Sequence, residues 1–352
     1  MMKFRLTLTW LAALVVTLTA CQHDAPSSGV KPVEERTILA LDDDGNIYNI
    51  HGNLVKTLPD CDVATQIITD GDDYFVSGIN SKTKVGYWKN GKWNTLHVDF
   101  IDDVDHWIFG IAKWDYNIYL LDYPCVLRNS GIFRLEDAEN FSPAKDGLSV
   151  SEGNCFVVGL VGEPGDDYPT TIRPVIYKEV KGVYKRFDMP LPEGAQQGGC
   201  NAICAYDRVH YVAGGVTQGQ ATMWEDDKVY TLPGIAQHDT PPGPYNTITS
   251  VEMVARGGGH IYAAGVEYVG DKSMSILWTD GVPRQLAYNT TDPDITSEVH
   301  DLVVYGNDVY VLTVESPFVA VGGQHVTTTS VIWMNGDVLA VLPFAVNSIA
   351  VY

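Results

Sequence analysis

Most of the chain after residue 36 alternates apolar and polar positions in short runs, and Asn, Asp or Gly residues separate the runs. One arrangement recurs, in which an apolar run with an aromatic residue is followed by a turn and a second run ending in Leu or Phe. Its clearest copies are YWKNGKWNTL from Tyr87, MWEDDKVYTL from Met223, LWTDGVPRQL from Leu277 and IWMNGDVLAVL from Ile332. A period of two with this turn chemistry is typical of β-hairpins. Each copy therefore predicts two strands.

Two further runs precede the hairpin in most units. The nearer run has an aromatic residue at its third position, and its copies are DYFVSG from Asp73, NIYLLD from Asn117, NCFVVG from Asn154, VHYVAG from Val209, HIYAAG from His260 and DVYVLT from Asp308. The farther run is represented by NAICAYD from Asn201, SVEMVARG from Ser250 and HDLVVYG from His300. The repeating unit therefore has four strands.

The aromatic anchors of the hairpins recur at intervals of 40 to 55 residues. They are Tyr48, Trp88, Phe133, Tyr177, Trp224, Trp278 and Trp333. Four-stranded β-propeller blades repeat roughly every 40 to 50 residues. We expect these large side chains to pack between neighbouring sheets as part of the scaffold.

The first unit lacks its inner strand, because the segment from Thr37 to Pro59 holds only three apolar runs. The C-terminal sequence FAVNSIAVY copies the missing strand. Pairing Ser348–Tyr352 with Thr37–Leu41 would close the ring and cover both exposed edges. We therefore predict an all-β fold over residues 36–352, a seven-bladed β-propeller in which three N-terminal strands and one C-terminal strand share a blade. Six or eight blades are the alternatives.

Composition agrees with this prediction and excludes some functions. The chain is 45% hydrophobic, with 33 Gly, 18 Pro and 19 Tyr, which favours strands and turns over long helices. It has 23 basic and 44 acidic residues, a net charge of −21. Such a chain repels phosphate backbones and anionic lipid headgroups, so we exclude nucleic acid as a partner.

Residues 1–21 have the pattern of a signal peptide, with Lys3 and Arg5 ahead of an apolar run from Leu8 to Ala20. The end of this run, Leu-Thr-Ala-Cys21, resembles the bacterial lipoprotein box, which implies cleavage before Cys21 and lipidation of its amino terminus. Gln22 rather than Asp follows the cysteine, and in this the chain resembles lipoproteins that are sorted to the outer membrane. Residues 22–35 are rich in Pro, Ser and charge and predict a flexible tether. We therefore expect a protein of the cell envelope attached to a membrane through Cys21.

The repeats resemble those of uncharacterised bacterial envelope lipoproteins with a VYVAG…WKNG pattern, and more distantly kelch-type propellers, over nearly all of residues 37–352. The resemblance implies the fold. It carries no functional residue over to this chain.

Extra residues fall between the second and third strands of several blades and between blades. Alternation of strand direction places both sets of connections at one end of a propeller, and long loops on one face commonly mark the binding face. The candidate ligand-binding residues on this face are aromatic or acidic, namely Tyr123, Asp166, Asp167, Tyr168, Tyr245, Tyr268, Tyr288, Asp292, Asp294 and Phe318. Aromatic rings with carboxylates suit sugars, and they also suit a protein hot spot.

Known catalytic and cofactor signatures are missing from the sequence, so we predict no cofactor and no metal. The segment His97–His106 holds two His and four Asp residues, but its spacing matches neither a calcium loop nor a zinc site, and we interpret it as a solvated loop. LDDDGN from Leu41 is interpreted as a turn. With Cys21 lipidated, five cysteines remain, so at least one is unpaired; Cys200 and Cys204 are too far apart in one strand to form a disulfide.

The sequence thus favours a lipid-anchored propeller that binds a glycan or a protein on its long-loop face without catalysis. Two alternatives stay open. One is a glycan-cleaving hydrolase or lyase that uses two carboxylates at the mouth of the ring. The other is a structural subunit of an envelope complex.

Overall fold

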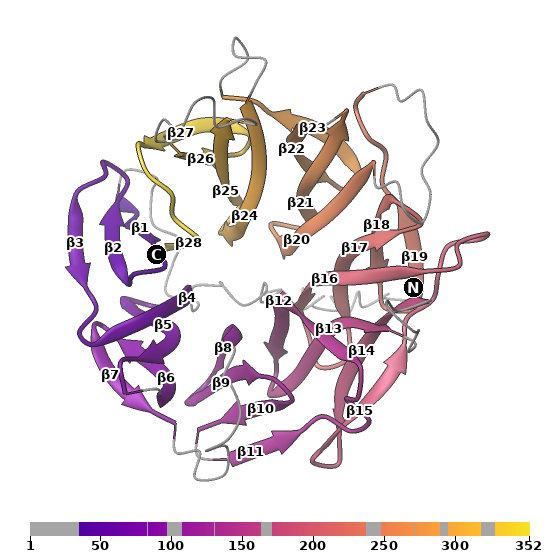
Figure 1. The fold of residues 1–352 in the computed structure, drawn as a ribbon, viewed down its shortest axis with the longest axis horizontal. Helices are drawn as coiled ribbons and strands as arrows, with labels where there is room; N and C mark the ends of the chain where they lie inside the picture. Colours follow the sequence, from indigo (N-terminus) through magenta and orange to yellow (C-terminus); the bar gives the residue numbers. More distant parts are fainter. Residues whose placement is uncertain are drawn as a thin grey trace, which may run out of the picture.

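The computed structural model describes residues 35–82, 84–96, 108–129, 131–162, 171–236, 248–270, 272–288, 295–317 and 328–352. These residues form 28 strands arranged around a central axis (Figure 1). In the described part of the chain, no helix is long and apolar enough to cross a membrane.

The strands form seven four-stranded antiparallel blades, and each blade is built from an innermost strand at the axis to an outermost strand at the rim. In this order, blade 1 holds β28 (Ser348–Val351), β1 (Ile38–Leu41), β2 (Asn46–Asn49) and β3 (Leu54–Thr57). Blade 2 holds β4 (Cys61–Asp70), β5 (Asp73–Asn80), β6 (Lys84–Lys89) and β7 (Lys92–Thr95). Blade 3 holds β8 (Ile108–Trp114), β9 (Asn117–Asp122), β10 (Cys125–Arg128) and β11 (Gly131–Arg134).

The remaining four blades repeat the same order. Blade 4 holds β12 (Phe141–Ser151), β13 (Asn154–Gly162), β14 (Ile172–Val180) and β15 (Val183–Asp188), and blade 5 holds β16 (Gly198–Ala205), β17 (Tyr211–Thr217), β18 (Gln220–Glu225) and β19 (Lys228–Thr231). Blade 6 holds β20 (Thr249–Gly257), β21 (His260–Val269), β22 (Lys272–Thr279) and β23 (Val282–Leu286), and blade 7 holds β24 (Ile295–Tyr305), β25 (Asp308–Pro317), β26 (Thr329–Met334) and β27 (Asp337–Leu342). A single backbone bridge, Asp146 to Ala202, joins the inner strands of blades 4 and 5.

The predicted ring closure is confirmed. β28 pairs antiparallel with β1, with Ser348 opposite Leu41 and Val351 opposite Ile38. The side chains of this C-terminal strand are buried, and Tyr352 exchanges two backbone hydrogen bonds with Thr37. The last strand of the chain therefore completes the first blade.

The hairpin turns explain the recurring Asn and Asp residues of the sequence motif. In five blades this residue has a positive φ near 50° and its side-chain oxygen accepts the N–H at the start of the second strand of the same blade. The five residues are Asn90, Asn129, Asp226, Asp280 and Asn335. Asn and Asp tolerate this conformation better than other residues with a Cβ. The motif therefore encodes both the turn and a hydrogen bond to the second strand of the blade.

The tryptophan anchors are scaffold residues, as predicted. Trp88, Trp224 and Trp278 are completely buried between blades. Their indole N–H groups donate to the carbonyls of Pro59, Pro190 and Pro233, which precede the inner strand of the same blade. Each indole thereby holds the segment that leads into the inner strand of its blade.

The assignment of Phe133 as the anchor of its unit is wrong. Phe133 lies in β11, the outermost strand of blade 3, and the position equivalent to Trp88 is occupied by Leu127 in β10. β9 and β10 are separated by only Tyr123 and Pro124, which are joined by a cis peptide bond. The third strand of this blade therefore begins earlier than the aromatic spacing indicates.

Inner strands are connected by a recurring side-chain hydrogen bond. In four inter-blade contacts a buried oxygen of one inner strand accepts a backbone N–H of the next one. The pairs are Ser348 Oγ with Ile67, Gln66 Oε1 with Ile111, Ser149 Oγ with Ala205 and Asp301 Oδ2 with Ile349. These bonds satisfy inner-strand N–H groups that no strand of their own blade reaches.

The two faces of the propeller differ in their connections. Every first-to-second and third-to-fourth strand connection within a blade ends on one face, which we call the short-turn face. The other connections end on the opposite face, the long-loop face. Six of them have eight or more residues, namely those between β7 and β8, β13 and β14, β15 and β16, β19 and β20, β23 and β24, and β25 and β26.

The chain enters the ring at the short-turn face. Arg36, just before β1, forms an ion pair of 2.6 Å with Asp308 in blade 7 and a hydrogen bond with the Tyr310 hydroxyl. Its guanidinium also lies over the Tyr305 ring. The described N-terminus is therefore fixed to the side of the ring opposite the long loops.

Candidate functional site

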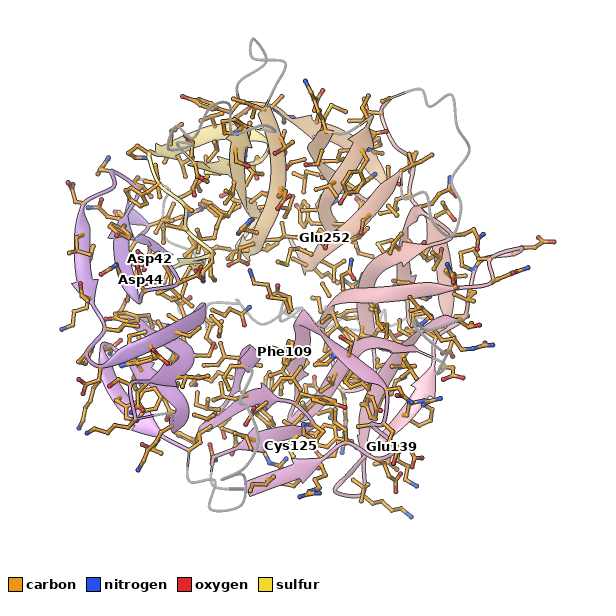
Figure 2. All side chains as sticks on the ribbon, viewed as in Figure 1. Asp42, Asp44, Phe109, Cys125, Glu139 and Glu252 are labelled. Atoms are coloured by element: carbon orange, nitrogen blue, oxygen red, sulfur yellow. The ribbon has the colours of Figure 1, made fainter. Side chains whose placement is uncertain are left out.

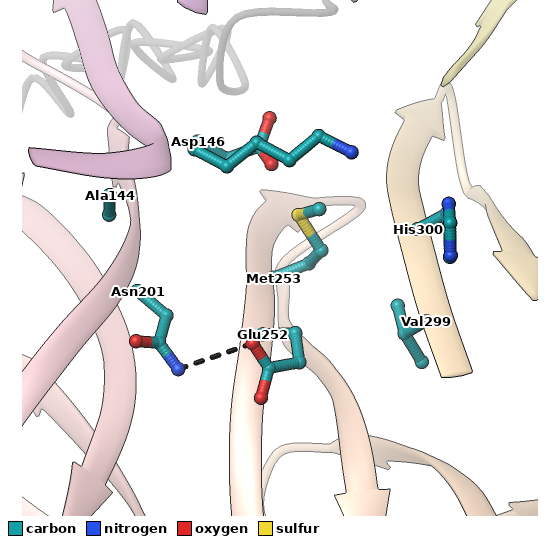
Figure 3. Close-up of a pocket in the computed structure, with 8 residues that line it drawn as sticks. Ala144, Asp146, Asn201, Glu252, Met253, Val299 and His300 are labelled. Carbon is teal, nitrogen blue, oxygen red and sulfur yellow. Dashed lines mark hydrogen bonds between the residues drawn. The ribbon is translucent and has the colours of Figure 1, made fainter. Parts of the chain in front are cut away.

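A pocket of about 290 Å³ lies in the central channel, where four consecutive inner strands, β12, β16, β20 and β24, approach one another (Figure 3). Its lining residues are Ala144, Lys145, Asp146, Asn201, Glu252, Met253, Val299 and His300. They occupy the first half or the midpoint of their strands, and inner strands begin at the long-loop face. The pocket therefore belongs to the long-loop half of the channel.

A repeated β-bulge creates this pocket. Each of the six inner strands from β4 to β24 has a bulge at the same level of its blade. The extra residues are Thr65, Phe109, the stretch 144–147, Asn201, Glu252 and His300. A bulge redirects a side chain that would otherwise pack on a blade face, and the polar lining residues of the pocket are bulge residues.

A glycine in the second strand accompanies the bulge in four blades. The glycines are Gly78, Gly159, Gly215 and Gly265, and a Cβ on any of them would lie 2.0–2.2 Å from a backbone carbonyl oxygen of the inner strand. Only glycine allows this approach without displacing the backbone. The final Gly of the VSG, VVG, VAGG and AAG motifs thus marks the level of the bulge.

Hydrogen bonds hold the pocket side chains in place. Gln66 accepts from the N–H of Ile111 and donates to Asp146 Oδ1 at 2.9 Å, so it ties three blades together. Asn201 donates to the carbonyl of Val251 at 2.8 Å and to Glu252 Oε2 at 3.3 Å (Figure 3). The site is therefore rigidly positioned by neighbouring strands.

Two buried polar atoms at the pocket have no hydrogen-bond partner among the described residues, namely Asp146 Oδ2 and His300 Nδ1. Burial raises the pKa of Asp146 to about 7, despite the opposing effect of Lys145. Burial, helped by Lys145, lowers the pKa of His300 to about 4. At neutral pH His300 is neutral, and Asp146 carries a proton for a substantial part of the time.

Glu252, which lines the pocket, and Tyr268 both have raised pKa values. Burial raises the pKa of Glu252, and the negative charge of Glu298 adds to this shift. The pKa of Tyr268 is also raised, by burial and by the charges of Glu252 and Glu298. Phe109 and Glu252 both lie at the inner ends of their blades, on different sides of the axis (Figure 2). Glu252 lines the pocket and Glu298 lies close enough to raise its pKa, so this side of the pocket is acidic.

Three of the residues predicted from the sequence are described by the structure. Of these three, Tyr268 lies close enough to Glu252 and Glu298 for their charges to raise its pKa. Tyr123 donates its hydroxyl to the Ala138 carbonyl at 2.8 Å and packs near Phe141, and Tyr288 is 45% exposed. The other candidates lie outside the described residues, namely Cys21, Asp166, Asp167, Tyr168, Tyr245, Asp292, Asp294 and Phe318, as does the segment His97–His106.

A buried glutamate fixes the start of a long loop in each of two blades. Glu267 in β21 accepts the N–H groups of Ile235 and Ala236 at 2.9–3.1 Å. Glu315, at the equivalent place in β25, accepts the backbone N–H of Tyr288, and burial raises its pKa. These carboxylates serve as anchors for the long-loop face.

Four cysteines are free thiols, and the acidic segment after Leu41 forms a turn. Cys61, Cys125, Cys155 and Cys200 are free, so the expected lack of a Cys200–Cys204 disulfide is confirmed. Burial raises the pKa of each of the four thiols. The segment after Leu41 is a turn in which Asp42 accepts from the N–H of Asn46. The described residues contain no group of three His, Cys, Asp or Glu side chains that could hold a metal ion.

Sequence reasoning did not identify Lys145, Asp146, Asn201, Glu252 or His300. Asn201 and His300 begin two of the quoted inner-strand motifs, and Glu252 lies inside a third. The signal that could have found them is the glycine of the second strand, because it indicates a bulge in the inner strand beside it.

Comparisons with known proteins add little to this description. No protein-family model and no curated protein matches the chain. Among solved structures, it is similar to the subtype N11 neuraminidase-like protein of A/flat-faced bat/Peru/033/2010 (H18N11), with 11% identity, 90% of this chain and 93% of the other covered, and a TM-score of 0.40.

Two further structures show comparable or weaker similarity. The extracellular domain of the B. thetaiotaomicron protein BT4673 has 10% identity, with 82% of this chain and 38% of that chain covered and a TM-score of 0.40. The Bombyx mori GH32 beta-fructofuranosidase BmSUC1 has 13% identity, with 62% and 59% covered and a TM-score of 0.30. The architecture described above therefore rests on the strand pairing of this chain alone.

Proposed function

We propose that this protein is a lipid-anchored propeller of the cell envelope that binds a glycan on its long-loop face without cleaving it. The observation that carries the proposal is the polar pocket in the long-loop half of the channel, with Asp146 and His300 each presenting a buried atom that has no partner among the described residues. Buried polar groups are normally hydrogen-bonded, so a ligand with its own polar groups would satisfy them.

A glycan fits this pocket better than a cationic protein side chain does. The lining combines groups that donate, such as Lys145, with groups that both donate and accept, such as Asn201 and a partly protonated Asp146. Sugar hydroxyls also donate and accept, whereas an ammonium or guanidinium group only donates. A protein ligand stays the alternative occupant of the same face.

The test is binding of the purified full-length protein to an array of bacterial and plant glycans, followed by calorimetry on the hits. We expect saturable binding to at least one glycan, with the glycan unchanged in length after incubation. Failure to bind any glycan, together with capture of one stoichiometric envelope protein by crosslinking in intact cells, would reject the glycan in favour of the protein ligand.

The anchor is a separate part of the proposal and has its own test. Support comes from the sequence Leu-Thr-Ala-Cys21 after a charged and apolar leader, with Gln22 favouring the outer membrane. Metabolic labelling with an alkyne fatty acid should mark the wild-type protein and not the Cys21→Ser variant. Fractionation should then find the wild type in outer-membrane fractions; recovery in the aqueous fraction would contradict the anchor.

Glycan cleavage is the second candidate, because Glu252 has the properties of a general acid. Its pKa is raised by burial and by the charge of Glu298, and both residues lie on the inner strands of adjacent blades. Release of reducing ends from a bound glycan by the wild type, and its loss in Glu252→Gln, would establish this function. Binding without release favours the non-catalytic protein.

A further inference from the structure

We infer that the channel pocket receives a single neutral sugar residue, recognised by His300 and Asp146, and that acidic sugars are excluded from it. This inference rests on the proposed glycan binding and specifies which part of the glycan enters the channel and which chemistry selects it. It is carried by the bulge geometry, the unpartnered atoms and the charges around the pocket.

The shape of the pocket favours one ring over an extended chain. Its volume of about 290 Å³ is at the lower end of the range of small-molecule pockets. Bulges from four consecutive inner strands surround it, and pairing of each inner strand with the second strand of its blade fixes their positions. A pocket built on rigid strands in this way selects by shape with little reorganisation on binding.

The unpartnered atoms define where sugar hydroxyls would bind. Asp146 Oδ1 is already occupied by Gln66, which leaves Oδ2 for a ligand. His300 Nδ1 has no hydrogen-bond partner in the described chain. The adjacent residues do not supply one, because Val299 is apolar and the Asp301 carboxylate already accepts three hydrogen bonds. Its donors are the Ser348 hydroxyl and the N–H groups of Leu302 and Ile349. One hydroxyl could therefore satisfy each buried atom.

The charges around the pocket disfavour an anionic ligand. Among the described residues that line it, Lys145 is the one cationic side chain. Four carboxylates lie close enough to the lining groups to shift their pKa values. Asp301 and Glu252 raise the pKa of Asp146, and Glu298 raises the pKa of Glu252. Asp43 partly opposes the lowering of the pKa of His300. A uronic or sialic acid would add a further negative charge to this set, and like charges at close range destabilise binding.

The test compares neutral and acidic monosaccharides on the full-length protein. The probes are the methyl glycosides of glucose, galactose and mannose, N-acetylglucosamine and methyl glucuronide, measured by saturation-transfer NMR and calorimetry. We expect at least one neutral probe to bind and glucuronide to bind at least about tenfold more weakly. His300→Ala should weaken the neutral probe about tenfold, which corresponds to one lost hydrogen bond with a buried group.

The matched control is His260→Ala, which removes an exposed histidine from the short-turn face, where it pairs with Asp280. It should leave the affinity unchanged. If glycans bind but His300→Ala and His260→Ala both behave as wild type, the channel inference is overturned and the proposed function stands. Equal binding of glucuronide and the neutral probes by the wild type also overturns it, whether or not the variants fold. Absence of glycan binding overturns both.

Discussion

Substitution of Asp301 by Asn should weaken the closure of the ring. Asp301 is 3% exposed, and its Oδ2 accepts from the Ser348 hydroxyl at 2.6 Å and from the Ile349 N–H at 2.8 Å. Its Oδ1 accepts the N–H of Leu302 at 2.7 Å. One carboxylate therefore receives three donors and joins the last strand of the chain to blade 7.

An Asn side chain offers only one oxygen, so at least one of these donors would face an NH₂ group. A buried donor without a partner costs about 1–3 kcal/mol, and hydrogen bonds to a neutral amide are weaker than those to a carboxylate. We expect Asp301→Asn to lower the free energy of unfolding by about 2–4 kcal/mol. Urea unfolding at pH 7, followed by tryptophan fluorescence, would measure the change.

Asp337→Asn is the matched control, since the Asp337 side chain is 83% exposed and pairs with Arg284 on the surface. Exposed ion pairs contribute at most about 1 kcal/mol. If both variants unfold at the same urea concentration with equal slopes, Asp301 does not hold the ring closed and the reasoning is refuted.

Three further predictions concern the core of the molecule. Because the pKa of Asp146 is raised to about 7, the contribution of this residue to stability should fall as pH rises from about 4 to 7, so Asp146→Asn should gain up to about 4 kcal/mol relative to wild type by pH 8 in parallel urea titrations; a gap independent of pH contradicts this. Gly215→Ala should prevent folding, as judged by circular dichroism, because its Cβ would lie 2.1 Å from the Gly199 carbonyl oxygen, whereas Gly182→Ala, whose Cβ meets no atom within 4 Å, should fold. Cys155 and Cys200 should resist iodoacetamide at pH 8 in the native protein and react in urea, since burial raises the pKa of both thiols; rapid native labelling detected by peptide mass spectrometry would disagree.

The fold was largely predictable from the sequence because hairpins and anchors are local signals. The turn residue and the period of two depend on neighbouring residues only, and the recurrence of this local pattern around Trp88, Trp224, Trp278 and Trp333 reveals the repeat. Ring closure was predictable for a different reason: one incomplete unit at the start and one extra strand at the end leave a single way to pair both edges.

The failures have equally specific causes. Blade 3 was assigned by its aromatic residue, but Leu127 fills the anchor position and Phe133 falls one strand further out. The pocket residues were missed because the second-strand glycine indicates that the inner strand beside it has a bulge, but the backbone register is needed to show which residue is the extra one. Bulges are fixed by contacts with the adjacent strand, which a single-strand pattern does not contain.

The point at which the chain enters the ring decides how the molecule can be oriented. The clamp of Arg36 on Asp308 holds the first described residues at the short-turn face, and the pocket opens in the opposite half of the channel. The described chain therefore starts from the face of the ring opposite the pocket opening. If the chain is anchored as proposed, the predicted flexible tether joins the side of the ring that faces away from the pocket, so the attachment leaves the opening unobstructed.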